Sequence, residues 1–283
     1  MSGTLGIISG SGELPVTVAK AALEASRPIF VIRIDGFLEP RLADYAGATV
    51  SMGEIGRTLA LLRENLCHEV VFAGHIRRPD LETLVFDKDS ERALPMLLAA
   101  AQSGDDALLS ALVQVYEQAG FAVIGAEAVC KSLLMPQGLL TNTGPTDRDL
   151  RDIRKGFMVA GHLGESDIGQ GCVVCDGLVL AVEAQEGTDA MLHRVPDLPK
   201  SVRGSVEERR GVLVKRARPM QDHRIDLPTI GLQTVECAVQ AGLAGIGLHA
   251  GAGLMLQQKD AIALADENEL FIMGIEEDKL GVE

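Results

Sequence analysis

The stretch "LGIISGSGELPVTVAKAA", Leu5–Ala22, decides the fold expected for this chain. Its apolar start predicts a strand, the glycine-rich "SGSGELP" predicts a turn, and the residues after it predict a helix. Such a unit can hold phosphate, because glycines allow close backbone approach and amides at a helix start attract anions. We therefore expect Gly10, Ser11 and Gly12 to contact a phosphorylated ligand. A tight turn without a ligand is the alternative.

Strands and helices alternate through the rest of the first half. The segments "PIFVIRIDG" and "EVVFAGHI" read as strands, "EIGRTLALLREN" reads as a helix, and a helical stretch from Ser90 to Ala119 breaks near Gly104. Strands separated by helices predict a mostly parallel sheet with both faces covered. Ligands of such sheets sit beyond the carboxyl ends of the strands. We therefore expect Gly74 and His75, in "AGHIRRPD", to contact the ligand too, although a solvated basic loop is the alternative.

The second half predicts another α/β domain with more hairpin character. "LLMPQGLLTNTGPTDRD" breaks the earlier pattern with two prolines and two glycines, and we take it as the connection between domains. The helix "TDRDLRDIRKGFMVAGHL" follows, with Thr146 or Asp147 as its cap. "GCVVCDGLVLAVEAQEG" predicts two antiparallel strands joined by the turn at 176–177. The expected organisation is a Rossmann-like domain at 1–134 and a mixed α/β domain at 135–283.

Composition narrows the class of protein. The net charge of −14 argues against a nucleic-acid partner, since duplex binders present a basic face. No apolar run reaches the ~18–20 residues needed to span a bilayer, and "MSGTLGII" lacks the features of a signal peptide, so we expect a cytoplasmic protein. An odd count of five cysteines argues against a disulfide framework. The "CVVC" at 172–175 reads as a buried strand rather than a zinc or redox motif.

Two stretches of the second half carry candidate chemistry. "EAQEGTDAMLHR" places Gly187 and Thr188 where a strand gives way to a helix, and such a turn can bind an anion; an ordinary capped helix is the alternative. "LVKRARPMQDHRIDLPTIG", at 213–231, gathers Lys215, several arginines, Asp222 and Asp226 near two prolines that argue for a stiff loop. Carboxylates beside cations suit a divalent metal with a phosphorylated substrate. A salt-bridged surface loop is the alternative.

Four stretches together resemble the LpxI family of UDP-2,3-diacylglucosamine pyrophosphatases: "GIISGSGELP", "SGDDALL", "EAQEGTDAMLHR" and "VKRARPMQDHRIDLPTIG". The resemblance covers nearly the whole chain, in order. The resemblance implies Mg²⁺-dependent hydrolysis of UDP-2,3-diacylglucosamine to UMP and 2,3-diacylglucosamine 1-phosphate (lipid X) in the lipid A pathway. It also implies a substrate cleft between two domains and attack at the sugar-side phosphorus. The resemblance implies, too, that one aspartate in "QDHRIDLP" is essential. Asp226 is favoured, and Asp222 also qualifies as a catalytic or metal-binding residue.

The resemblance further implies roles and partners. Lys215 and neighbouring arginines would neutralise the pyrophosphate. Apolar helices such as "ALPMLLAAAQ" could line an acyl groove, and core packing is the favoured alternative for any single one of their residues. The expected partners are the lipid nucleotide, lipid X and, transiently, the cytoplasmic face of the inner membrane, with a homo-oligomer left open. Two alternatives remain from the residues alone. One is an NAD-dependent oxidoreductase, which the glycine turn and Asp35 favour and Pro15 opposes, since it stands where the third fingerprint glycine belongs. The other is a non-catalytic nucleotide-sugar or lipid carrier.

Overall fold

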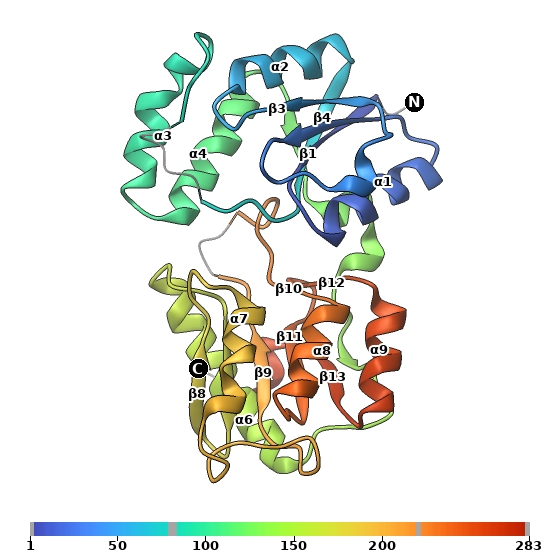
Figure 1. Cartoon of the computed structure of the whole chain (residues 1–283), viewed down its shortest axis with the longest axis vertical. Coiled ribbons are helices and arrows are strands. Elements are labelled where there is room, and N and C mark those ends of the chain that lie inside the picture. Colours follow the sequence, from blue (N-terminus) through green and yellow to red (C-terminus); the bar gives the residue numbers. More distant parts are fainter. Residues whose placement is uncertain (1–2, 79–83, 219–221, 281–283) are drawn as a thin grey trace. The chain divides into compact units, whose positions relative to one another are not determined.

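A computed structural model describes residues 3–78, 84–218 and 222–280, and it divides the chain into two compact units (Figure 1). The first unit comprises Met1–Lys131 together with the short segment Asp222–Asp226. The second comprises Ser132–Gln221 and Leu227–Glu283. The segment Asp222–Asp226 therefore packs with residues that lie about a hundred positions away in the sequence.

The first unit is built on a parallel five-stranded sheet in the order β3-β2-β1-β4-β5. Its strands are β1 (Thr4–Ser9), β2 (Ile29–Ile34), β3 (Gly47–Val50), β4 (Cys67–Ala73) and β5 (Ala122–Val123). Its helices are α1 (Glu13–Glu24), α2 (Ile55–Glu64), α3 (Leu94–Ala101), α4 (Asp105–Gln118) and α5 (Ala126–Val129), with 3-10 turns at Pro40–Leu42 and Ser90–Arg92. The expected mostly parallel sheet is confirmed, and so is the break at Gly104, whose φ is 125°.

The second unit has a mixed six-stranded sheet in the order β6-β13-β11-β9-β7-β8. Its strands are β6 (Gly138–Leu139), β7 (Gly171–Cys175), β8 (Leu178–Val182), β9 (Val212–Lys215), β11 (Gly245–His249) and β13 (Phe271–Ile275), and β10 (Thr229–Ile230) pairs separately with β12 (Leu254–Met255). The helices are α6 (Asp147–Glu165), α7 (Thr188–His193), α8 (Leu232–Gln240), α9 (Gln258–Glu267) and α10 (Glu277–Leu280), with 3-10 turns at Lys131–Leu133, which straddles the boundary, and Val195–Asp197. Because β9, β11 and β13 run parallel while β7 and β8 run antiparallel, the expected mixed α/β class is confirmed.

The β7–β8 hairpin shows how a buried carboxylate fixes a turn. Asp176 and Gly177 both have positive φ, 50° and 78°, as a tight two-residue hairpin turn of this kind requires. Asp152 of α6 is buried and accepts hydrogen bonds from both turn amides, at 2.8 Å from Asp176 and 2.7 Å from Gly177. The predicted hairpin and its turn are confirmed, and Asp152 explains why the turn is held against the helix.

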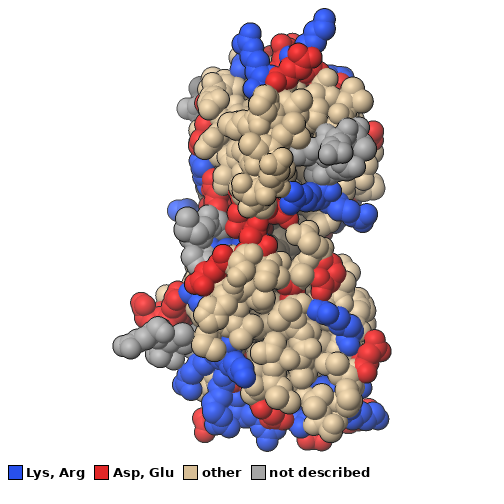
Figure 2. Space-filling view, turned by 90° about the vertical axis from the view of Figure 1, so that its left-hand side faces the viewer, with Lys and Arg blue, Asp and Glu red and all other residues tan. Residues whose placement is uncertain are grey.

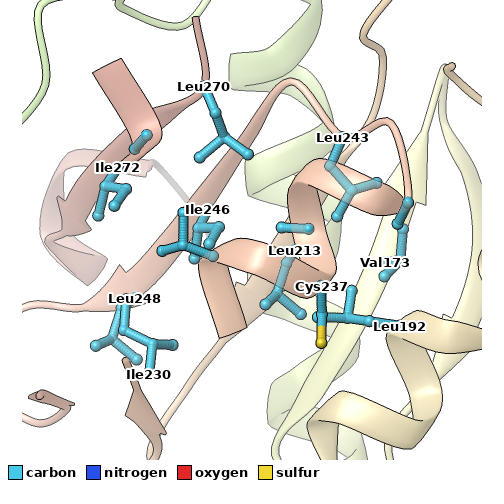
Figure 3. Close-up of a cluster of buried hydrophobic side chains, with 14 of the residues drawn as sticks. Val173, Leu192, Leu213, Ile230, Cys237, Leu243, Ile246, Leu248, Leu270 and Ile272 are labelled. Carbon is cyan, nitrogen blue, oxygen red and sulfur yellow. The ribbon is translucent and has the colours of Figure 1, made fainter. Parts of the chain in front are cut away.

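Aliphatic side chains build the core of the second unit, as the low aromatic content requires. Figure 3 shows Leu213, Ile246 and Ile272 from neighbouring strands packed with Leu192 and Cys237 from helices. The "CVVC" strand is wholly buried, and burial raises the pKa of the Cys172 thiol to about 12. A thiol held protonated is a poor metal ligand or nucleophile, which supports its interpretation as a core strand.

The helices and the surface show how apolar residues are distributed. No helix within the described residues is both long and apolar enough to cross a bilayer. Helix α3 contains no charged residue and leaves Leu98 38% exposed. The face drawn in Figure 2 shows uncharged residues over much of the first unit, with acidic and basic side chains toward its margins.

Candidate active site

The carboxyl ends of β1 and β4 meet at the switch point of the first sheet, where strand order reverses. Ser11 and His75 form an antiparallel bridge there, with each backbone amide donating to the other's carbonyl at 3.1 and 2.8 Å. A Cβ on Gly10 would lie 2.5 Å from the His75 carbonyl oxygen, and one on Gly74 would lie 2.7 Å from that of Ser11. Both glycines are therefore required by the approach of two backbone segments. Open α/β sheets bind ligands at such a switch point.

The glycine turn before α1 already holds an internal anion. Gly12, whose φ of 101° suits glycine, donates its amide to Glu39 Oε2 at 3.1 Å. Glu39 Oε1 accepts from the amide and Nε of Arg41, at 3.2 and 2.7 Å. The hydrogen bond from the Arg41 side chain is the main cause that lowers the pKa of Glu39 to about 2. Since the Gly10 amide donates to Ala73, these amides are engaged within the unit.

The segment Asp222–Asp226 is a turn held by an arginine fork. Both carboxylate oxygens of Asp222 accept from Arg224: Oδ1 from Nε at 2.9 Å and from the backbone amide at 3.0 Å, and Oδ2 from Nη2 at 2.6 Å. This fork lowers the pKa of Asp222 and keeps it ionised. The amide of Asp226 closes the turn by donating to the Asp222 carbonyl oxygen at 3.3 Å.

Contacts with the first unit hold the same turn in place. Arg224 Nη1 pairs with Glu117 of α4 at 2.6 Å and also donates to the Val123 carbonyl oxygen of β5 at 3.4 Å. Ile225 packs against the hydrophobic core of that unit. Asp226 follows this anchored stretch and is partly exposed. The stiffening expected from Pro219 lies outside the described residues.

Lys215, Thr188 and Glu183 form a compact polar group in the second unit. Lys215 Nζ lies 2.6 Å from Thr188 Oγ1, 3.4 Å from Glu183 Oε1 and 3.3 Å from the Thr229 carbonyl oxygen. Thr188 begins α7 directly after Gly187, whose φ is 81°. All three donors of the ammonium group thus face atoms of the protein.

The structure sorts the residues singled out from the sequence into three groups. The first unit holds the strand-end group and the turn with both aspartates, and the second unit holds the group around Lys215. The members of the strand-end group are Gly10, Ser11, Gly12, Gly74 and His75. Sequence reasoning missed Glu39 and Glu117, because their partners lie 27 and 107 positions away. Glu183 opens the stretch "EAQEGTDAMLHR", of which the sequence pointed only to Gly187 and Thr188.

A metal ion held by the protein alone would need several ligand side chains gathered at one place. In the ranges 3–78, 84–218 and 222–280, no group of three histidine, cysteine, aspartate or glutamate side chains could hold an ion. Magnesium characteristically uses one or two carboxylates and completes its shell with water and substrate phosphates. Both oxygens of Asp222 are engaged by Arg224. A magnesium ion bound through one carboxylate and a phosphorylated substrate would not need a group of three such side chains.

Fold and site define a class: a two-unit α/β protein with a Rossmann-type sheet and an arginine-anchored turn that bears an aspartate. Comparison with known proteins then gives the family. The model of the LpxI N-terminal domain matches residues 4–133, and that of the LpxI C-terminal domain matches 136–273. The chain belongs to the LpxI family.

Two similar proteins give this membership context. The UDP-2,3-diacylglucosamine pyrophosphatase LpxI of Caulobacter vibrioides is 46% identical over 272 residues, which cover 96% of this chain and 97% of the relative. A solved structure of N5-carboxyaminoimidazole synthase from Aspergillus clavatus shares 12% identity with a TM-score of 0.25, over 65% of this chain and 42% of that one. The second likeness is too weak to carry an argument.

Proposed function

We propose that this chain hydrolyses the pyrophosphate bond of UDP-2,3-diacylglucosamine, releasing UMP and 2,3-diacylglucosamine 1-phosphate in lipid A biosynthesis. The observation that carries the proposal is the 46% identity, over nearly the full length of both chains, to a pyrophosphatase named for that substrate. The match to both LpxI domain models supports it. The oxidoreductase alternative gains no support from this family, and Glu39 places a carboxylate beside the turn that would receive a dinucleotide phosphate.

Asp226 is the residue to which we assign the chemistry. Its carboxylate would accept a hydrogen bond from the attacking water and take up its proton. The water oxygen then bonds to one phosphorus atom while the bond from that phosphorus to the bridging oxygen breaks, and the displaced phosphate leaves. We assign Asp222 to the support of this turn, because Arg224 engages both of its oxygens. The two aspartates called catalytic on sequence grounds thus receive different roles.

Magnesium fits this scheme through Asp226. When bound, the ion would neutralise the negative charge of the pyrophosphate. The chain's own residues would orient the water and hold the two ends of the substrate. Lys215, with Thr188 and Gly187, is assigned to the phosphate groups, and the strand-end residues Ser11 and His75 to the remainder of the ligand.

The lipid part of the substrate requires an apolar surface. Helix α3 is uncharged and has Leu98 partly exposed, which supports a role for it in contacting acyl chains. Extraction of such a substrate would bring the protein transiently to the cytoplasmic face of the inner membrane. A liposome flotation assay with and without the lipid nucleotide would test this contact, and binding only in the presence of substrate is expected.

A turnover assay tests the function. Purified protein is incubated with UDP-2,3-diacylglucosamine in EDTA or in excess Mg²⁺, and products are identified by mass spectrometry. The proposal expects UMP and 2,3-diacylglucosamine 1-phosphate in equal amounts with Mg²⁺ and little turnover in EDTA. Tight binding of the lipid nucleotide without release of UMP would instead identify a carrier. Equal turnover in EDTA would show that the reaction does not require magnesium.

A further inference from the structure

Three polar side chains from separate elements meet in the interior of the second unit. Lys215 ends β9, Thr188 begins α7, and Glu183 follows β8. The side chains of Lys215 and Glu183 are only 4% and 9% exposed. Burying two charges costs desolvation energy that their attraction offsets only in part, so a buried ion pair is weak evidence for stability. This group therefore calls for a role other than holding the fold.

The hydrogen bonds of the group run in one direction. An ammonium group can only donate and a carboxylate can only accept. Thr188 Oγ1 lies 2.6 Å from both Lys215 Nζ and Glu183 Oε1. The Thr188 hydroxyl therefore donates its proton to Glu183 and accepts from Lys215. Glu183 thus fixes the orientation of the hydroxyl, and through it one of the three contacts of the ammonium group.

The second carboxylate oxygen of Glu183 lies in a buried space that a glycine provides. Glu183 Oε2 is buried and has no hydrogen-bond partner among the residues that the structure describes. A Cβ on Gly171 would lie 2.5 Å from this oxygen and 3.3 Å from Lys215 Cγ. Glycine at the start of β7 thus makes room for a charged group that leaves one acceptor unsatisfied. An unsatisfied buried acceptor costs about 1–3 kcal/mol, which again argues against a stabilising purpose.

We propose that Glu183 is a positioning residue for the pyrophosphatase reaction, acting through Thr188 and Lys215. The inference rests on the proposed function, which assigns those two residues to the phosphate groups. Glu183 keeps the Lys215 contact to Thr188 short, at 2.6 Å, and leaves the longer contacts, at 3.3 and 3.4 Å, for a phosphate oxygen to replace. Lys215 then meets the charge that develops in the transition state from a fixed position.

The first test is Glu183→Gln, which keeps the shape and one acceptor but removes the charge. We expect kcat to fall about tenfold or more, with a much smaller change in KM, because a misplaced group that acts in the transition state lowers kcat. Asp152→Asn is the matched control: Asp152 is a buried carboxylate of the same unit that accepts hydrogen bonds from the two amides of the β7–β8 turn. It is expected to lower the melting temperature and leave kcat unchanged.

A double variant separates positioning from folding. Glu183→Gln with Lys215→Met removes both buried charges, so thermal stability is expected to return toward that of the wild type. If Glu183 acts through Lys215, the double variant should have the same low kcat as Lys215→Met alone. A kcat of the double variant that lies below that of Lys215→Met by the full Glu183→Gln effect would show that Glu183 acts independently of Lys215 and overturn the inference. So would a folded Glu183→Gln variant with wild-type kcat. Failure of the wild type to release UMP would instead refute the proposed function, and this inference with it.

Discussion

The carboxylate of Glu39 gives the sharpest test of how the glycine turn before α1 is held. In Glu39→Gln the side chain keeps its size but loses its charge, and its amide nitrogen would face N–H donors of Gly12 or Arg41. Lowering the pKa from 4.5 to about 2 corresponds to about 3 kcal/mol. Arg41 is 50% exposed, and water screens its part of that interaction. We therefore expect the free energy of unfolding to fall by about 1–2 kcal/mol at pH 7.

The same prediction carries a pH dependence. A carboxyl whose pKa is lower in the folded protein contributes its stability above the unfolded value, and loses it as pH falls toward the folded value. For Glu39 the contribution is complete above about pH 4.5 and disappears toward about pH 2. The difference between wild type and Glu39→Gln should therefore shrink as the pH is lowered through this window.

Urea unfolding followed by circular dichroism between pH 7 and pH 3.5 measures this difference. Glu24→Gln, at the exposed end of α1, is the matched control and should unfold like the wild type. A Glu39→Gln protein as stable as the wild type at pH 7 would refute the reasoning. A destabilisation that stays constant down to pH 3.5 would show that charge is not its cause.

Three further predictions follow from the site and its support. Asp222→Asn breaks the fork with Arg224 and should lower kcat by about tenfold. This loss should be smaller than that caused by Asp226→Ala, and steady-state rates of UMP release measure both. Asp152→Ala leaves the amides of the 176–177 turn without their acceptor, so the free energy of unfolding measured with urea should fall by about 3 kcal/mol. The kcat at 25 °C should be retained, and a loss of kcat in folded protein would contradict this prediction. If water attacks the sugar-side phosphorus, hydrolysis in H₂¹⁸O should place the label in 2,3-diacylglucosamine 1-phosphate. Label in UMP would show attack at the uridine-side phosphorus instead.

Periodicity predicted those elements whose buried side chains are aliphatic and regularly spaced. It missed β3, "GATV", because only Val50 of that strand is buried. It also missed α9, whose buried residues are Ala261 and Ala265. Two small side chains give a weak apolar stripe, and the helix is held by the neighbours it packs against rather than by its own pattern.

The candidate site was predictable as far as its chemistry is local in sequence. The glycines near Ser11 and the charge cluster around Asp222 are visible as short motifs. Their contacts with Glu39 and Glu117 are not, because these pairs form only when distant segments fold together. Arg224 could be seen as one cation among several, but its contacts with both carboxylate oxygens of Asp222 could not be predicted.

Release of UMP by wild-type protein and by Asp226→Ala tests the central claim most directly. The assay uses UDP-2,3-diacylglucosamine with Mg²⁺, and circular dichroism checks that the variant is folded. Wild-type protein should convert the substrate to UMP and 2,3-diacylglucosamine 1-phosphate, whereas the folded variant should bind the substrate and release neither. Near-normal turnover by folded Asp226→Ala would contradict the account.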